Sequence, residues 1–150
     1  MKTDYELLNA QAKALVSGEQ DFIANMANIS ALLFNSMEGL NWAGFYRNVN
    51  GELVLGPFQG QAACIRIAFG KGVCGTAAST KETQIVADVH QFEGHIACDA
   101  ASNSEIVIPI IKDNNVIAVL DIDSPHFSRF NEEDEFGLQK IVQTLLDTLE

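Results

Sequence analysis

Basic residues and long apolar runs are scarce in this sequence. Nine lysines and arginines stand against twenty aspartates and glutamates, which gives a net charge of −11. Nucleic acids and anionic membranes are bound through basic surfaces, so this charge argues against both as partners. No apolar stretch approaches the roughly 20 residues that cross a bilayer, and the acidic, amphipathic N-terminus is not typical of a signal peptide. We therefore expect a cytoplasmic protein.

Cysteine is also scarce, and its placement is the most informative feature of the chain. Cys64, Cys74 and Cys98 lie in polar or glycine-rich sequence (QAACIRI, GKGVCGTAA and GHIACDAAS). Such surroundings expose a thiol and lower its pKa, and Cys74 follows Lys71 near an expected helix start. By this reasoning Cys74 is the first candidate for a thiolate. Two thiols that meet in space can act as attacker and resolver, through a sulfenic acid and a disulfide.

Two other interpretations of the cysteines stay open from their spacing alone. A free cysteine is often an inert, buried apolar residue. A zinc site is the chemical rival, because His90, His95 and Cys98 lie within nine residues. There is no C-x-x-C pair, however, and the spacing matches no common structural zinc pattern, so we predict no metal.

The pattern of apolar residues predicts two helices, a run of strands and a final helix. With 150 residues and no Pro/Gly/Ser-rich linker, the chain is expected to form one domain over residues 1–150. The first helix is marked by Tyr5, Leu8, Ala12 and Leu15, and the second by Phe22, Met26, Ile29, Leu33 and Met37. Strands are expected at 41–49, 52–56, 64–70, 83–89, 105–111 and 116–122, with a short helix at 73–81 and a last helix after Asn131. This order predicts an α+β fold, with the terminal helices on one face of a mostly antiparallel sheet.

Three acids lie at strand ends within strongly apolar sequence. Glu105 opens one expected strand, and Asp121 and Asp123 end the next. A three-residue connection, Asp113 to Asn115, places Glu105 opposite Asp123, whereas a two-residue turn places Glu105 on the other face. Like charges across strands are destabilising, so a cationic or proton-donating ligand between them is one interpretation. Solvent-exposed charges at the strand ends are the other.

Two aromatic residues share one face of the first expected strand. Trp42 and Tyr46 are four positions apart, with Gly44 between them. Aromatic residues here can pack in the core or can form the wall of a small pocket. Gly44 leaves room between the rings, and a glycine within a strand is typical of a bulge or of a closely approaching ligand.

Taken together, these motifs resemble the free methionine-(R)-sulfoxide reductases, a family built on a GAF domain. The resemblance lies in NWAGFY, LVLGPFQG, Ala63-Cys64, GKGVCGTAA, DVHQFEGHIACDAASNSEIVIPI and LDIDSP, and it includes all three cysteines with their spacing. Glu93 and Ala62 stand where the family usually has proline, which affects loop stiffness more than chemistry.

The resemblance implies a role for each candidate residue. Cys98 corresponds to the nucleophile, Cys64 to the resolving thiol and Cys74 to an auxiliary thiol. Glu105, Asp121 and Asp123 correspond to the substrate-binding acids, and Trp42 to the aromatic residue that packs on the methyl end of the substrate, with Tyr46 beside it. The implied cycle ends in a disulfide that an external thioredoxin-type dithiol reduces, without any other cofactor.

Two further function classes remain as alternatives. The chain could be a non-catalytic GAF sensor of a small molecule, or a redox sensor whose disulfide changes a contact with a partner. Turnover of a sulfoxide with a dithiol reductant separates the reductase from both. The apolar surface of the first two helices is also compatible with a homodimer.

Overall fold

The computed structural model describes residues 1–96 and 100–149 of the chain. Cys98, the expected nucleophile, therefore lies outside the described residues. The α-helices are α1 (Tyr5–Val16), α2 (Phe22–Ser36), α3 (Gly72–Thr80) and α4 (Glu132–Leu146), with short 3₁₀ turns η1 (Val89–Gln91) and η2 (Asp147–Leu149). The strands are β1 (Trp42–Val49), β2 (Glu52–Gly60), β3 (Arg66–Ala68), β4 (Gln84–Val86), β5 (Ser104–Lys112) and β6 (Asn115–Ser124).

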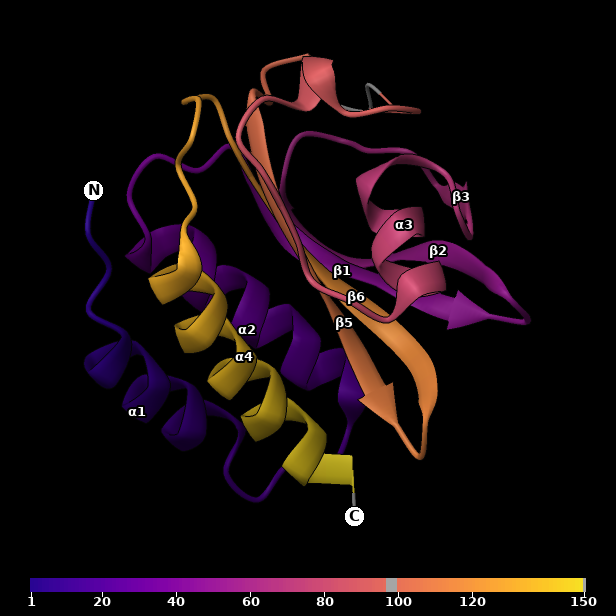
Figure 1. Cartoon of the computed structure of the whole chain (residues 1–150). Helices are drawn as coiled ribbons and strands as arrows, with labels where there is room; N and C mark the ends of the chain where they lie inside the picture. Colours follow the sequence, from indigo (N-terminus) through magenta and orange to yellow (C-terminus); the bar gives the residue numbers. More distant parts are fainter. Residues whose placement is uncertain (97–99, 150) are drawn as a thin grey trace.

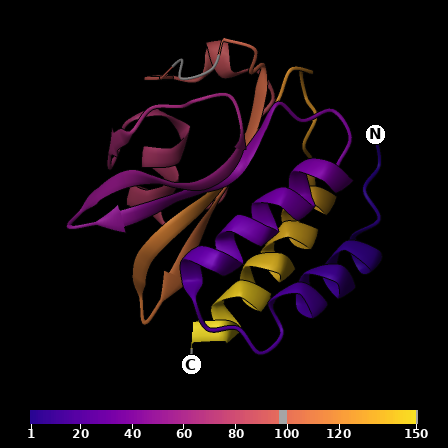
Figure 2. The same ribbon diagram turned by 180° about the vertical axis from the view of Figure 1, so that it is seen from behind.

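The strands form one six-stranded sheet in the order β3-β2-β1-β6-β5-β4. Every paired neighbour in this sheet is antiparallel. Helices α1, α2 and α4 lie together on one side of the sheet, and α3 lies on the other (Figure 1). The reverse view shows the same division (Figure 2). The predicted α+β fold, with the terminal helices on one face, is confirmed. No helix in the described part of the chain is long and apolar enough to cross a membrane.

The helices begin where short polar side chains can cap them. The carboxylates of Asp4 and Asp21 accept hydrogen bonds from the backbone amides of Leu7 and Ala24, and Asn131 forms a capping box with Asp134 at the start of α4. On α1 the prediction was wrong in one position. Leu15 is 42% exposed, and Val16 is buried with Leu8 and Ala12 instead.

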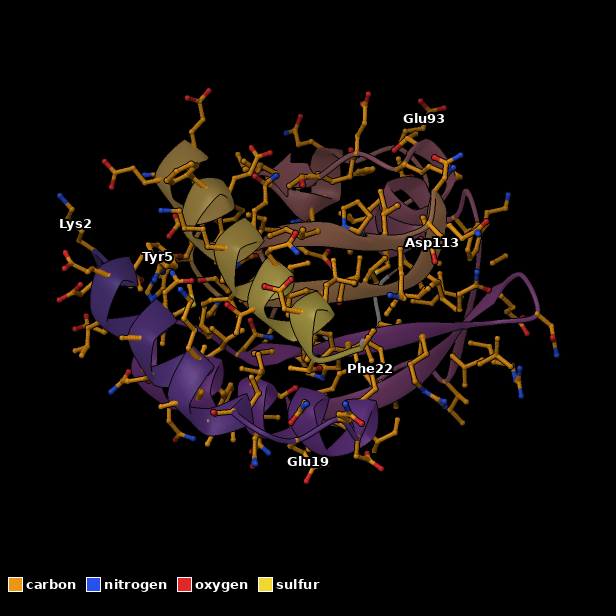
Figure 3. The ribbon with its side chains drawn as sticks, turned by 90° about the horizontal axis from the view of Figure 1, so that it is seen from below. Lys2, Tyr5, Glu19, Phe22, Glu93 and Asp113 are labelled. Atoms are coloured by element: carbon orange, nitrogen blue, oxygen red, sulfur yellow. The ribbon has the colours of Figure 1, made fainter. Side chains whose placement is uncertain are left out.

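Successive residues of the central strands point to opposite faces of the sheet, as the pleat requires. On β1, Ala43 and Phe45 belong to the apolar core under the three-helix layer, whereas Trp42 and Tyr46 belong to a second apolar cluster under α3. The sheet therefore has a helix-layer face, covered by α1, α2 and α4, and an α3 face. Figure 3 views the molecule with the helix layer in front, with Tyr5 at its edge.

The β5–β6 hairpin combines a tight turn with a bulge. Lys112 pairs with Asn115, so Asp113 and Asn114 form a two-residue turn, both with positive φ (51° and 65°) as a type I′ turn requires. Between Ile110 and Ile111 the register then shifts, because Ile110 pairs with Ala118 and Ile111 with Val116. Of the two connections that the sequence left open, the two-residue turn is the one formed, but the consequence predicted for it, Glu105 on the other face, is wrong. The bulge adds the missing residue, and Glu105 still lies opposite Asp123.

The edge strands differ from the predicted ranges. β3 and β4 are three residues each, much shorter than expected, because each pairs with a neighbour on one side only. In contrast β2 continues to Gly60, four residues beyond its predicted end, because β1 pairs with it along this length.

Candidate active site

A cavity lies between the α3 face of the sheet and the first turn of α3. Its floor is built by rows of residues that face one another across strands. One row contains Trp42 on β1, Asp123 on β6 and Glu105 on β5, and the next contains Gly44 and Asp121. Trp42, Asp121, Asp123 and Glu105 all line the cavity. The bulge in the hairpin is therefore what brings the three predicted acids to one face.

Carboxylic acids of this kind are charged in water at neutral pH, but in this protein all three are buried. Asp121 is 5% exposed, and its Oδ1 atom accepts no hydrogen bond from a described residue. Burial, followed by the charges of Asp121 and Asp123, holds the pKa of Glu105 well above its usual range. Burial also raises the pKa of Asp121, although hydrogen bonding to Glu105 and Asp123 partly opposes this. The acids on the floor of the cavity therefore tend to keep their protons, and they favour the binding of a cation.

Cys74 closes the cavity from the side of α3. Its Sγ atom lies 4.0 Å from Oε2 of Glu105, and its side chain is buried. Burial raises the pKa of the Cys74 thiol, and the nearby carboxylates of Asp121 and Glu105 raise it further. The expectation of a low-pKa thiolate at Cys74 is wrong. The nearby helix start and Lys71 do not outweigh burial next to three acids.

Two groups of residues bear on the question of a metal. One ligand atom each from Cys74, Glu105 and Asp121 lies within 4.8 Å of the others, which is close enough in principle for a cation. The rival zinc set is less compact in its described part. The rings of His90 and His95 are 6.3 Å apart between centroids, and His90 pairs with Asp88 at 2.8 Å. Cys98 of that set is outside the described residues.

Aromatic rings from β1 and β2 form a stack along the cavity. Trp42 lies parallel to Tyr46, with centroids 6.0 Å apart, and to Phe58 at 5.0 Å. The room over Gly44 is filled by Phe58, whose Cβ atom would clash with any side chain at position 44. Gly44 thus permits close packing of the strand neighbour, and the pairing of β1 with β2 shifts register between Gly44 and Tyr46. The bulge interpretation of this glycine is confirmed, and its interpretation as a site of ligand approach is wrong.

Two segments outside the sheet also line the cavity. The start of α3 contributes Lys71, Gly72 and Val73, and the segment before β5 contributes His95, Ile96 and Ser102. Burial and the charge of His90 lower the pKa of His95, which favours the neutral imidazole. Lys71 is the N-cap of α3 and makes no side-chain cap.

Sequence reasoning did not single out Ile96 or Ser102 as part of the site. Ser102 is buried and accepts a hydrogen bond from Nδ2 of Asn41 at 3.0 Å. Ile96 is the side chain nearest to the space beside Gly72, whose φ is +63°. Their only signal was their position in the long segment between two expected strands, where functional residues are common.

Cys64 lies in the irregular segment between β2 and β3. It is half-buried and packs against the α3-face cluster, and the neighbouring Ala63 lines the cavity. The site thus brings together Trp42, Tyr46, Cys74 and the three acids, with Cys64 at its edge.

Comparison with known proteins decides the family. A GAF domain family model matches residues 23–150. The free methionine-R-sulfoxide reductase of Escherichia coli is 55% identical over 141 residues, covering 94% of this chain and 86% of that protein. This chain belongs to the free methionine-R-sulfoxide reductase family. It is an oxidoreductase with a GAF fold.

Further relatives of this family agree with the assignment. The free methionine-R-sulfoxide reductase of Saccharomyces cerevisiae is 46% identical over 148 residues, covering 93% of this chain and 82% of its own. The solved structure of fRMsr from Staphylococcus aureus in its reduced form has a TM-score of 0.97 and 53% identity, covering 99% of this chain and 97% of that one. The free methionine-R-sulfoxide reductase of Neisseria meningitidis in complex with its substrate has a TM-score of 0.94 and 41% identity, covering 97% of this chain and 87% of that one.

Proposed function

We propose that this protein reduces free L-methionine-(R)-sulfoxide to L-methionine in the cavity under α3. The observation that carries the proposal is the row of buried carboxylates beside an aromatic wall. Buried carboxylates are costly unless a cation or a proton compensates them. The free ammonium of an amino acid supplies that cation, and Trp42 offers an apolar surface for the methyl end. The family relatives carry the same activity in their names.

The first chemical step transfers the sulfoxide oxygen to a thiol. The Cys98 thiolate attacks the sulfoxide sulfur, the S=O bond breaks and one proton is taken up. Cys98 is thereby oxidised to a sulfenic acid, and methionine is released as the reduced sulfide. The proton has to reach the departing oxygen, which a carboxylic acid of raised pKa can provide. Glu105 meets that requirement, because its pKa is well above its usual range.

The second step removes the sulfenic acid. The Cys64 thiol attacks the sulfur of Cys98, a disulfide forms and water leaves. The states of the two cysteines in the structure support Cys64 over Cys74 as the resolving thiol. Cys64 is disulfide-bonded and half-buried, whereas Cys74 is free and buried with a raised pKa. A thiolate is the attacking species, so the pKa of Cys74 disfavours it in this role.

An external dithiol then completes the cycle. Two electrons from a protein of the thioredoxin type reduce the disulfide and restore both thiols, while the partner becomes a disulfide. Because such reductants keep thiols reduced in the cytoplasm, we propose that the reaction takes place there.

The far end of the substrate is a carboxylate, and the start of α3 is suited to it. The first amides of a helix have no partner within the helix, and they carry a partial positive charge. Gly72, Val73 and Cys74 provide these amides at the cavity. Methionine within a polypeptide has no free ammonium and no free carboxylate, so the proposed site accepts only the free amino acid.

The test is to mix the reduced protein with each epimer of free methionine sulfoxide, without external reductant. Methionine and remaining thiols are then measured. We expect about one methionine per chain from the R epimer with loss of two thiols, and none from the S epimer. Absence of methionine from both epimers, with all thiols intact, would contradict the proposed activity.

A further inference from the structure

The segment that carries Cys64 lies outside the strands of the sheet. Residues 61–65 lie between the end of β2 at Gly60 and the start of β3 at Arg66. Three hydrogen bonds fix its carbonyl oxygens. Nε1 of Trp42 donates to the carbonyl oxygen of Gln61 at 3.0 Å, and the Tyr46 hydroxyl donates to that of Cys64 at 2.8 Å. The amide of Leu55 donates to the carbonyl oxygen of Ile65 at 2.8 Å.

Two of these three donors are aromatic side chains of β1, and their positions are rigid. Trp42 and Tyr46 are each 2% exposed and lie on the α3 face of a strand that pairs on both sides. The Trp42 ring is stacked between Tyr46 and Phe58. The sheet therefore holds the Cys64 backbone directly through the Tyr46 ring, and it holds Gln61 in the same segment through the Trp42 ring.

The hydrogen bond also decides what Tyr46 can do in the cavity. A tyrosine hydroxyl has one proton, and here it is donated to the Cys64 carbonyl oxygen. Burial and the nearby acids, Asp121 first, raise the pKa of Tyr46 above its ordinary value, so the proton is retained. Toward the cavity the hydroxyl can only accept a hydrogen bond. Tyr46 is thus not a proton source for the sulfoxide oxygen.

We propose that Tyr46, assisted by Trp42, is a positioning residue for the resolving thiol, holding the Cys64 backbone where disulfide closure is fast. The proposal rests on the proposed function, in which Cys64 attacks the sulfenic acid of Cys98 and water leaves. Closure within one chain depends on the placement of the two sulfurs, and small displacements slow such steps strongly. The hydroxyl of Tyr46 acts through the Cys64 peptide and not on the reacting atoms.

The test compares the two tyrosines of the chain as a matched pair. Tyr46→Phe keeps the ring and removes the hydrogen bond to Cys64. Tyr5→Phe removes a hydroxyl that donates to Asp134 on the helix-layer side, at 2.6 Å. Reduced protein is mixed rapidly with free methionine-(R)-sulfoxide. Methionine formation, sulfenic acid trapped by dimedone, and loss of the second thiol are followed in time.

We expect the ratio of the closure rate to the methionine-formation rate to fall about five- to tenfold in Tyr46→Phe, the size expected for one hydrogen bond. The trapped sulfenic acid should rise in proportion, and Tyr5→Phe should keep the wild-type ratio. An unchanged ratio in Tyr46→Phe overturns the proposal, and so does an equal fall in both variants. If Tyr46→Phe does not fold, Trp42→Phe replaces it, because it removes the hydrogen bond to Gln61 of the same segment. Trp42 also faces the substrate, so in this variant only the rate of closure after the sulfenic acid has formed is compared with wild type; we expect the same fall, and an unchanged closure rate overturns the proposal.

Failure of the proposed function gives a different result from failure of this inference. If the wild-type protein forms no methionine, hydrogen peroxide can oxidise the thiolate to a sulfenic acid, with water as the other product. Closure then follows without the substrate. Slower closure in Tyr46→Phe under peroxide supports the positioning role even then, and equal closure rates contradict it.

Discussion

The two faces of the sheet are built from the same strands but carry different kinds of side chain. On the helix-layer face, Ile106, Leu120 and Ile122 pack into an apolar core. On the α3 face, their immediate neighbours Glu105, Asp121 and Asp123 are buried carboxylates. The helix-layer face is apolar where these residues lie and stabilises the protein, whereas on the α3 face the three buried acids lower stability at a site that a ligand completes. Neighbouring residues on one strand therefore serve different roles: one packs in the apolar core, and the next lines the cavity.

The largest effect expected on the α3 side is the loss of the nucleophile. Cys98→Ser should abolish methionine formation, because a serine hydroxyl does not attack the sulfoxide sulfur under these conditions. Methionine is measured in a single turnover with the R epimer. Cys64→Ser is the matched control, and it should still give one methionine per chain while losing turnover with thioredoxin. Methionine formation by Cys98→Ser would move the nucleophile to another residue.

On the helix-layer side, Ile122→Ala should reduce stability and leave the chemistry of the folded protein in place. Ile122 is fully buried in the helix-layer core, so the loss should be about 2–5 kcal/mol in the free energy of unfolding. Urea denaturation measures this, and methionine formed per folded molecule should stay within about twofold of wild type, since no atom of the cavity is removed. A loss of activity without a loss of stability would contradict the assignment of stability to the helix-layer face and of the chemistry to the α3 face.

The neighbouring acid should behave in the opposite way. Glu105→Gln should lower kcat/KM about 100-fold, the scale expected for loss of a general acid, and should raise the melting temperature. Steady-state kinetics with thioredoxin and thermal unfolding measure the two effects. A variant with wild-type kinetics would show that the acids are structural only.

The pH dependence of stability follows from the same acids. The folded-state pKa of Glu105 and that of Asp121 are raised. Such groups contribute most stability below their unfolded pKa, near 4, and lose it as the pH rises toward the folded-state value. The wild-type melting temperature should therefore decline above about pH 4 more steeply than that of Glu105→Gln. Parallel curves for the two proteins would contradict the cause assigned to these pKa shifts.

The smallest effect is expected on the surface. Asp88 pairs with His90 at 2.8 Å, and this hydrogen bond lowers the pKa of Asp88. The pair stabilises above the unfolded pKa of Asp88 and is lost as the pH falls through its lowered folded-state pKa. Because exposed pairs contribute little, Asp88→Asn should leave the melting temperature at pH 7 nearly unchanged. A drop of several degrees in the melting temperature would contradict this expectation and would show that the pair holds the chain segment after Asp88 in place.

Much of the helix-layer face could be predicted from the sequence, because apolar spacing and capping residues are local signals. Asn131 caps the last helix as expected, and Asp4 and Asp21 cap the first two in the same way. The α3 face was harder to predict. The burial of Cys74 and the filling of the space over Gly44 by Phe58 depend on tertiary packing. The alignment of Glu105 with Asp123 depends on a turn and a bulge together, and no residue pattern separated these from a longer connection.

The most direct test of the account concerns the ammonium of the substrate. Reduced protein is given equal concentrations of free methionine-(R)-sulfoxide and of its N-acetyl derivative, and methionine or N-acetylmethionine is measured over a single turnover. The account predicts reduction of the free amino acid only, because the acetylated nitrogen carries no positive charge to compensate the buried carboxylates of Asp121 and Asp123. Equal reduction of both compounds would contradict the claim that the buried acids of the α3 face bind the substrate through its ammonium.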